Sequence, residues 1–470
     1  GGRLSRPDLL PRPVEIPRFR MEGRIHEKPP GIEVASFSAD LGGPTLHASG
    51  RVLKHLDFPA IDLNIGVDRL RLSDAVAYWP STLAEEARSW VASRFSSGDI
   101  VDARVQLNLE PRPFTPAELL PNAIKAVIPF RDVSLEYFPP LPKLENAGGI
   151  ATLGSEGIRI EVNQGRIRRS RLASGRVDIR SWDRKMDAVK IQTTLQGPAN
   201  DLVDAVAELR NHPNADLLRF DSGSAETRLK IEFPLEDEPS RGDIKISAET
   251  DINAIRIADL YGFQIEDGYL RATWGEGKLA FKGGVRTDSI PFDLQGQFLV
   301  HAPAGADGDK GTDRNGEGLI RLQATVHEQD LPQLGLPRLP FLRGSAETTT
   351  RIRLAPSSTK ITLTADFQHT RIELSPLGWT KPAGENATIE IHARPESKGK
   401  LRFSKIRFFA DEARISGFGH IQTGSPMQAE FRLDPLEMGR NRLKLDYAHI
   451  NGRSDVSIRG SALDAAPLIT

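Results

Sequence analysis

The sequence predicts an all-β protein built mainly from antiparallel strands. Three observations support this prediction. Apolar and charged residues alternate from residue 30 onward, Gly and Pro punctuate the segments between the alternating runs, and most connections are too short for a crossover helix. At 470 residues the chain also exceeds the size at which one compact core stops growing, so several domains or a repeating structure are expected.

The alternating runs predict strands with one apolar face and one charged face, because successive side chains of a strand point to opposite sides. The clearest runs are residues 227–233 (TRLKIEF), 243–252 (DIKISAETDI), 359–367 (TKITLTADF), 387–393 (ATIEIHA) and 441–447 (NRLKLDY).

Convincing helices are few. The best spans 82–95, where Thr82 and Glu85 match a capping box. Its apolar face carries Leu83, Trp90, Val91 and Phe95. A short helix is predicted over 200–210, and a weaker one over 115–128 is interrupted by Pro121.

A loose internal repeat divides the chain. Alternating blocks open at Gly31, Gly149, Gly268 and Gly384, and the segments SDAVAYWP, NDLVDAVA, EQDLPQLG and ALDAAPLI recur as short helical closures. The predicted organisation is an entry segment (1–30), three repeats (31–148, 149–267 and 268–383) and a partial C-terminal repeat (384–470).

Motifs of catalysis and metal binding are missing from the sequence. The composition of residues 301–318 predicts a flexible loop; its acidic spacing resembles an EF-hand, but position twelve is Ala324 and a solvated loop is the favoured interpretation. There is no cysteine, no clustered histidine motif, no nucleophile elbow and no phosphate-binding loop. The 62 basic and 63 acidic residues are interspersed, which disfavours nucleic acid. We therefore expect no catalytic residue, metal or cofactor.

The apolar face of each strand must be buried against a second sheet, a layer of helices or a ligand, and the helices are too few. Two sheets closing on each other would give a structural or adhesive array of β-sandwiches without a lipid cavity. A sheet that only curls would instead form an apolar trough for acyl chains, since large apolar patches are seldom left in water. Both arrangements give the same alternation.

Residues 77–109 (AYWPSTLAEEARSWVASRFSSGDIVDARVQLNL) resemble the signature segment of the AsmA-like superfamily, in particular its large YhdP-type members. There a Tyr-Trp-Pro helix and a following Ala-Arg-x-Trp precede a Gly-led strand. Residues 131–167 are similar to the next block of that family, and 377–391 and 460–469 resemble recurring C-terminal pieces. The likeness covers most of residues 30–470 in order.

The resemblance implies an elongated, curled, taco-like sheet, a repeating β-groove lined with apolar side chains. It implies a non-enzymatic carrier of phospholipid between the inner and outer membranes, working in the periplasm of a Gram-negative bacterium. The inner-membrane anchor helix and an outer-membrane partner are expected outside this segment. The helix over 82–95 would then border or plug the groove with Leu83, Trp90, Val91 and Phe95.

The candidate groove residues are the apolar members of the alternating pairs, whose charged neighbours, such as Lys230 and Lys245, should face water. These candidates are Leu229, Ile231, Phe233, Ile244, Ile246, Ile361, Leu363, Ile389, Ile391, Leu443 and Leu445.

Overall fold

The fold is given by a computed structural model, which describes two compact units. Unit 1 comprises Gly1–Arg219 and Ala225–Glu249, and unit 2 comprises Phe220–Ser224 and Thr250–Thr470. The structure describes residues 2–5, 13–55, 58–79, 85–110, 123–136, 142–180, 188–210, 219–234, 243–260, 263–299, 317–334, 336, 338–355, 358–397, 399–422, 428–450 and 452–464.

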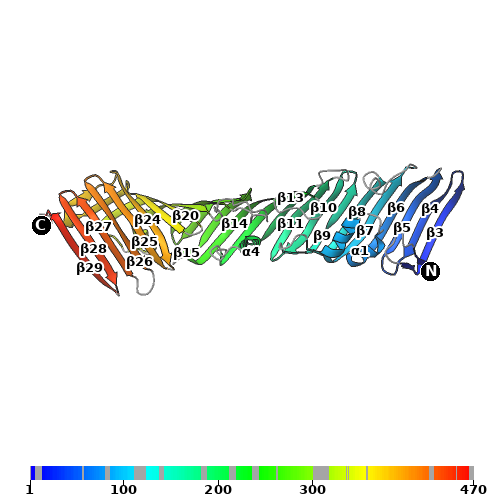
Figure 1. The fold of residues 1–470 in the computed structure, drawn as a ribbon, viewed down its shortest axis with the longest axis horizontal. Helices are drawn as coiled ribbons and strands as arrows, with labels where there is room; N and C mark the ends of the chain where they lie inside the picture. Colours follow the sequence, from blue (N-terminus) through cyan, green and yellow to red (C-terminus); the bar gives the residue numbers. More distant parts are fainter. Residues whose placement is uncertain are drawn as a thin grey trace, which may run out of the picture. The chain divides into compact units, whose positions relative to one another are not determined.

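Unit 1 is an antiparallel meander in which each strand from β3 to β12 pairs with the next (Figure 1). Two short strands, β1 (Gly2–Leu4) and β2 (Val14–Ile16), form a separate pair. The meander consists of β3 (Arg18–Glu27), β4 (Pro30–Asp40), β5 (Thr45–His55), β6 (Phe58–Arg71), β7 (Phe95–Leu109), β8 (Ile124–Leu135), β9 (Leu144–Gly154), β10 (Gly157–Ile167), β11 (Ser170–Arg180) and β12 (Ala188–Pro198). Strands β13 (Ser222–Pro234) and β14 (Lys245–Leu260) contribute residues to both units.

Unit 2 continues the same antiparallel pattern. Its strands are β15 (Phe263–Ile265), β16 (Asp267–Gly275), β17 (Lys278–Thr287), β18 (Ile290–Leu299), β19 (Gly318–His327), β20 (Leu342–Ala355), β21 (Ser358–Asp366), β22 (Thr370–Leu374), β23 (Trp379–Lys381), β24 (Ala387–Ser397), β25 (Lys400–Ala410), β26 (Ala413–Gln422), β27 (Gln428–Met438), β28 (Asn441–Ile450) and β29 (Arg453–Ala462). Strands β22 and β23 form a small hairpin that pairs with the start of β20.

The described helices α1, α2, α4, η2 and η3 lie at one end of the strands within their units. In unit 1, α1 (Leu72–Tyr78) and α2 (Glu85–Arg94) connect β6 to β7, and α4 (Ala199–Arg210) follows β12; Figure 1 shows α1 and α4 along the same border. In unit 2, the 3-10 helices η2 (Glu328–Asp330) and η3 (Ser375–Leu377) follow β19 and β22. Successive connections of a meander alternate between the two ends of the strands, so every second connection lies at the same end. We call the end that carries these helices the helix rim and the opposite end the loop rim.

The all-β, mainly antiparallel prediction is confirmed. Strands make up 78% of the structure and helices 7%, so helices cannot cover the faces of the sheet. All five clearest alternating runs fall on strands, namely β13, β14, β21, β24 and β28.

The predicted helices differ in detail from those of the structure. Helix α2 spans Glu85–Arg94, Phe95 already belongs to β7, and residues 80–84 lie outside the described residues. The weak helix over 115–128 is wrong from Ile124 onward, where β8 begins, because the β-branched residues of this segment pair with β7. The loop over 301–318 lies outside the described residues except for Glu317 and Gly318. The repeat boundaries stay a prediction.

Candidate functional site

One face of the sheet in unit 1 is a continuous apolar surface, which we call the inner face. Strand pairing aligns the apolar residues of neighbouring strands into rows that cross the sheet. One row consists of Ile25, Ile32, Val52, Ile61 and Leu109 on β3–β7. Another consists of Ala126, Leu153, Ile158, Ile179 and Val189 on β8–β12.

Unit 2 has an inner face of the same kind. One row runs from β18 to β25 through Leu294, Leu322, Thr350, Leu363, Ile391 and Ile406. The row beside it consists of Phe281, Gly296, Ile320, Ile352, Ile361 and Ala393 on β17–β24. The register of the strands therefore gathers apolar side chains that lie far apart in the sequence on one surface.

The outer face carries charged side chains in cross-strand pairs. Arg159 donates to Asp178 at 2.9 Å, and Arg432 donates to Asp446 at 2.6 Å. Hydrogen bonds from Lys405 and His392 lower the pKa of Glu390 to about 2. These pairs are solvated ion pairs of a water-facing surface, and each is worth little to stability.

Burial differs between the two halves of the inner face. On β7, Ala103 in the middle of the strand is buried, whereas Val105, Leu107 and Leu109 toward the loop rim are half-buried. On β25, Phe408 near the helix rim is 8% exposed and buried, whereas Ile406 is half-buried. On these two strands the inner face is therefore more deeply buried toward the helix rim, while Ala126, Val189 and Ala393 toward the loop rim of other strands are buried as well.

In unit 2 the β22–β23 hairpin covers the helix-rim half. Trp379 is 4% exposed and packs edge-to-face on Phe408, with ring centroids 6.2 Å apart. The buried cluster beneath and around the hairpin consists of Ile372, Trp379, Ala387, Phe408, Ala413, Leu436, Met438 and Leu443. Covering this half leaves the loop-rim half of β24–β28 as the accessible apolar surface.

A buried lysine fixes the hairpin. The Lys381 side chain is 1% exposed, and its Nζ donates to the carbonyl oxygens of Phe367, Thr370 and Pro382 at 2.8–2.9 Å. All three N–H donors are therefore satisfied, as a buried ammonium requires. Burial lowers the pKa of Lys381, which the charges of Glu385 and Asp366 partly oppose.

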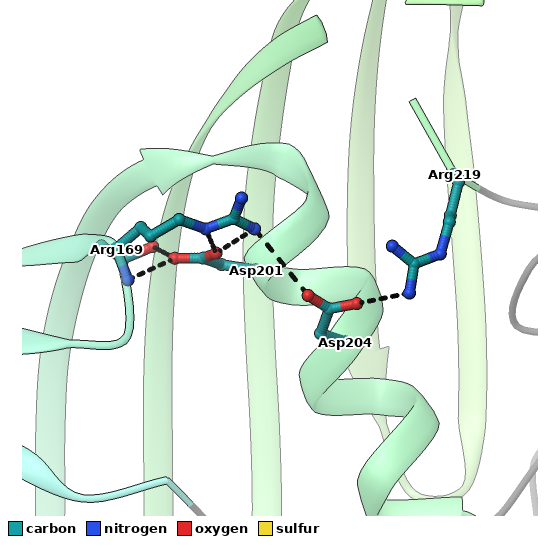
Figure 2. A network of polar contacts seen from close by, with 5 residues as sticks. Arg169, Asp201, Asp204 and Arg219 are labelled. Carbon is teal, nitrogen blue, oxygen red and sulfur yellow. Dashed lines mark hydrogen bonds and ion pairs between the residues drawn. The ribbon is translucent and has the colours of Figure 1, made fainter. Parts of the chain in front are cut away.

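In unit 1 a polar network holds α4 to the helix rim (Figure 2). Asp201 accepts hydrogen bonds from the backbone N–H and Nε of Arg169, at 3.0 and 2.7 Å, and from the Ser170 hydroxyl at 2.8 Å. Asp204, one turn later, accepts from Arg219 at 3.3 Å. Asp201 and Ser170 are each 7% exposed, so the Asp201 end of this network is buried, whereas the Arg169 and Arg219 side chains are mostly exposed.

Hydrogen bonds between neighbouring connections are also found after other strands. The Tyr78 hydroxyl, at the end of α1, donates to the Leu41 carbonyl in the β4–β5 connection. Ser289, in the β17–β18 turn, donates to the Gln333 side chain after η2. After β29, the Asp464 N–H donates to Asn441 at the β27–β28 turn. Each of these segments, like α4, is thus bonded to the preceding connection at its own rim.

The total accessible surface agrees with an uncovered inner face. The chain exposes 29785 Å². A compact monomer of its mass would expose about 17,000 Å², and two separate compact bodies of half that mass about 21,000 Å². Sheets without a second layer contribute to this excess.

The predicted groove residues are all buried or half-buried, and Ile361, Leu363 and Ile391 lie in the apolar rows of unit 2. In β13 and β14, Ile231 is buried and Ile246 is half-buried, while Lys230 and Lys245 between them in the alternation are exposed. Leu443 belongs to the cluster under the hairpin, and Ile389 and Leu445 pack against it. The remaining candidates, Leu229, Phe233, Ile244, Ile361, Leu363 and Ile391, are half-buried.

The predicted plug residues are placed only in part. Val91 on α2 is half-buried, Phe95 begins β7 opposite Leu135, and the side chains of Leu83 and Trp90 lie outside the described residues. Helix α2 contacts α1 and β7, and α1 contacts β6 and β7 with Ala75 and Ala77 buried. A role of α2 as plug stays a prediction.

Sequence reasoning missed the β22–β23 hairpin and its lysine. The signal was present in LGWTKPAGE (377–385), where one tryptophan and one lysine alternate within a short Gly- and Pro-bounded run. Among the described residues, no group of three or more His, Asp or Glu side chains is arranged to hold a metal ion.

A comparison with protein families identifies the chain. The family model described as YhdP protein matches residues 2–438. The chain belongs to the YhdP family. This is a family of AsmA-like, large periplasmic lipid-transfer proteins, so the resemblance seen in residues 77–109 and 131–167 is confirmed. Comparisons with curated proteins and with solved structures returned no match.

Helices of the described part of the YhdP-family chain are short. None of them is long and apolar enough to cross a membrane.

Proposed function

We propose that the inner face of each unit forms an apolar groove that carries phospholipid without any enzymatic step, in transport between the inner and outer membranes. The observation that carries this proposal is the inner face itself. Its apolar rows continue from strand to strand, and many of their residues, such as Leu294, Leu363 and Ile406, stay only half-buried. Membership in the YhdP family supports the same reading.

The energetics favour acyl chains as the ligand. Each CH₂ removed from water contributes about 0.8 kcal/mol, so two acyl chains lying on the inner face would be held firmly. A uniform apolar surface offers no deep local minimum, and no catalytic group is needed for a lipid to slide along it. The charged outer face keeps the protein in solution.

The proposal places the protein in the periplasm of a Gram-negative bacterium. An inner-membrane anchor and an outer-membrane partner would be supplied outside this segment, and phospholipid acyl chains would be the only ligand bound along the sheet. Cofactors, metals and nucleic acid have no part in this function.

The rival proposal is a structural array whose apolar faces are sealed by protein. The cluster under the β22–β23 hairpin is buried by protein in this way, and this observation supports the rival proposal. The two proposals differ in what touches the loop-rim half, which is lipid in the first and protein in the second.

Lipid content tests the proposal directly. The protein is purified from bacteria and its bound lipids are extracted and identified by mass spectrometry. We expect phospholipid in the wild type, a clear loss in Ile246→Glu and Leu363→Glu, and no loss in the outer-face controls Lys245→Glu and Lys360→Glu. Folded wild-type protein without bound phospholipid would instead support the sealed array.

A further inference from the structure

Aromatic side chains on the inner face of unit 2 lie across glycines of the neighbouring strand. Phe281 on β17 pairs with Gly296 on β18, and Phe298 on β18 pairs with Gly318 on β19. A Cβ atom added at Gly296 would collide with the tip of the Phe281 ring, and one at Gly318 would collide with the Phe298 ring. Each ring therefore occupies the space directly above its glycine.

The two rings also contact each other. Their centroids are 5.8 Å apart and their planes differ by 22°, so Phe281 and Phe298 are stacked side by side. Both are half-buried, as are the apolar residues around them. The pair forms a continuous plate on the floor of the inner face.

A second plate lies on β25–β27. Phe403 and Phe431 both pair with Gly419 on the strand between them. Strands two apart are separated by about 9.6 Å, whereas these ring centroids are 5.7 Å apart. The rings therefore lean toward each other over Gly419, and Phe431 occupies the position of its missing side chain.

Ring position decides how much of the groove is free. A side chain that stands perpendicular to the sheet projects into the space above the inner face. A ring that lies over a glycine stays close to the backbone and leaves that space to a ligand. At Gly296 and Gly318 a side chain would force the ring upward, because the nearest atoms are all ring atoms, whereas at Gly419 it would also meet the backbone oxygen of Glu430.

We propose that Phe281, Phe298, Phe403 and Phe431, lying over Gly296, Gly318 and Gly419, set the depth of the groove and thereby its capacity for acyl chains. This inference rests on the proposed function. It makes the four rings specificity-determining contacts, with a chemical preference for unbranched apolar chains that can lie flat on the plates.

The chain offers a matched control on the outer face. Tyr269, which is 58% exposed, pairs with Gly284, and a Cβ atom at Gly284 would lie 2.9 Å from its ring. Gly284→Ala and Gly296→Ala thus displace a similar ring in a similar sheet position, one into solvent and the other into the groove. If the rings only stabilise the sheet, the Gly284→Ala and Gly296→Ala variants should bind the same amount of lipid.

The experiment places a photo-reactive amino acid at Leu322, on β19 beside the first plate, in the full chain in bacteria. Phospholipid adducts are quantified by mass spectrometry in the wild type, in Gly296→Ala and in Gly284→Ala, and the melting temperature of each protein is recorded. We expect adducts in the wild type and in Gly284→Ala, and their loss in Gly296→Ala. The double variant Gly296→Ala/Phe281→Leu should recover them, because no ring remains to be displaced.

The outcomes separate the two proposals. If the folded wild type gives no adduct at Leu322, the proposed function fails and this inference fails with it. Adducts in the wild type that persist in Gly296→Ala, or that fall equally in Gly284→Ala, overturn the inference and leave the groove standing. Should Gly296→Ala not fold, Gly318→Ala with its ring Phe298 provides the same comparison.

Discussion

The helix-rim and loop-rim halves of the inner face on β24–β28 are made by the same strands with the same alternation, yet one is a core and the other is open. On β25, Phe408 packs under Trp379, while Ile406, two residues away, is half-buried. The difference comes from the chain between β21 and β24, which folds back as the β22–β23 hairpin. Alternation therefore defines an apolar face, and a connection outside the alternating runs decides whether protein covers it.

The largest loss of stability is expected when a large side chain is removed from the covered half. Phe408→Ala should lower the free energy of unfolding by about 3–5 kcal/mol, because it leaves a cavity in a sealed cluster. Phe403→Ala, on the same strand in the open half, should cost roughly 1–2 kcal/mol, since its ring is only half-buried. Urea unfolding followed by circular dichroism measures both. Equal losses would erase the distinction between the two halves.

A somewhat smaller loss of stability is expected when Lys381, which fixes the β22–β23 hairpin, is replaced. Lys381→Met keeps much of the volume but leaves the carbonyl groups of Phe367, Thr370 and Pro382 without their donor. We expect a cost of about 2–4 kcal/mol from unsatisfied buried groups. In the variant, amide hydrogen exchange should become faster than in the wild type in β22 and β23, and should stay unchanged in β26. Unchanged protection of the hairpin would show that apolar packing alone holds the cover in place.

Helix α4 in unit 1 is held at the helix rim by polar contacts. Asp201→Ala removes the acceptor of the Arg169 and Ser170 hydrogen bonds and should cost about 1–3 kcal/mol. Proteolysis near α4 should increase, whereas Asp204→Ala, which loses only two long ion pairs with the exposed Arg169 and Arg219 side chains, should resemble the wild type. Equal sensitivity of the two variants would argue against the buried network.

The smallest effect is expected on the outer face. The pKa of Glu390 is lowered from 4.5 to about 2, so the ionised carboxylate stabilises the fold above pH 4.5 and this contribution is lost as the pH falls toward 2. Because Glu390 is about a third exposed, the contribution is at most about 1 kcal/mol. Glu390→Gln should flatten the acid side of the stability curve slightly. An identical pH dependence in both proteins would contradict the pairing.

Much of the fold could be predicted from the sequence, because period-two alternation is a local signal. It predicted that Leu229 and Ile246 would be less exposed than their neighbours Lys230 and Lys245, and their burial follows this alternation. It could not show that Leu443 lies under a cover, since the residues that cover it are about 65 positions away in the hairpin. The ring-over-glycine pairs also escaped it, because they depend on strand register and not on the order of residues within one strand.

Photo-crosslinking along β25 tests the central claim most directly. A photo-reactive amino acid is placed in turn at Ile406 (open half), Phe408 (covered half) and Arg407 (outer face) in the full chain in bacteria, and phospholipid adducts are identified by mass spectrometry. An open lipid groove beside a sealed core predicts adducts at Ile406 and none at Phe408 or Arg407. Folded protein with no adduct at Ile406, or with as many at Arg407 as at Ile406, would contradict it.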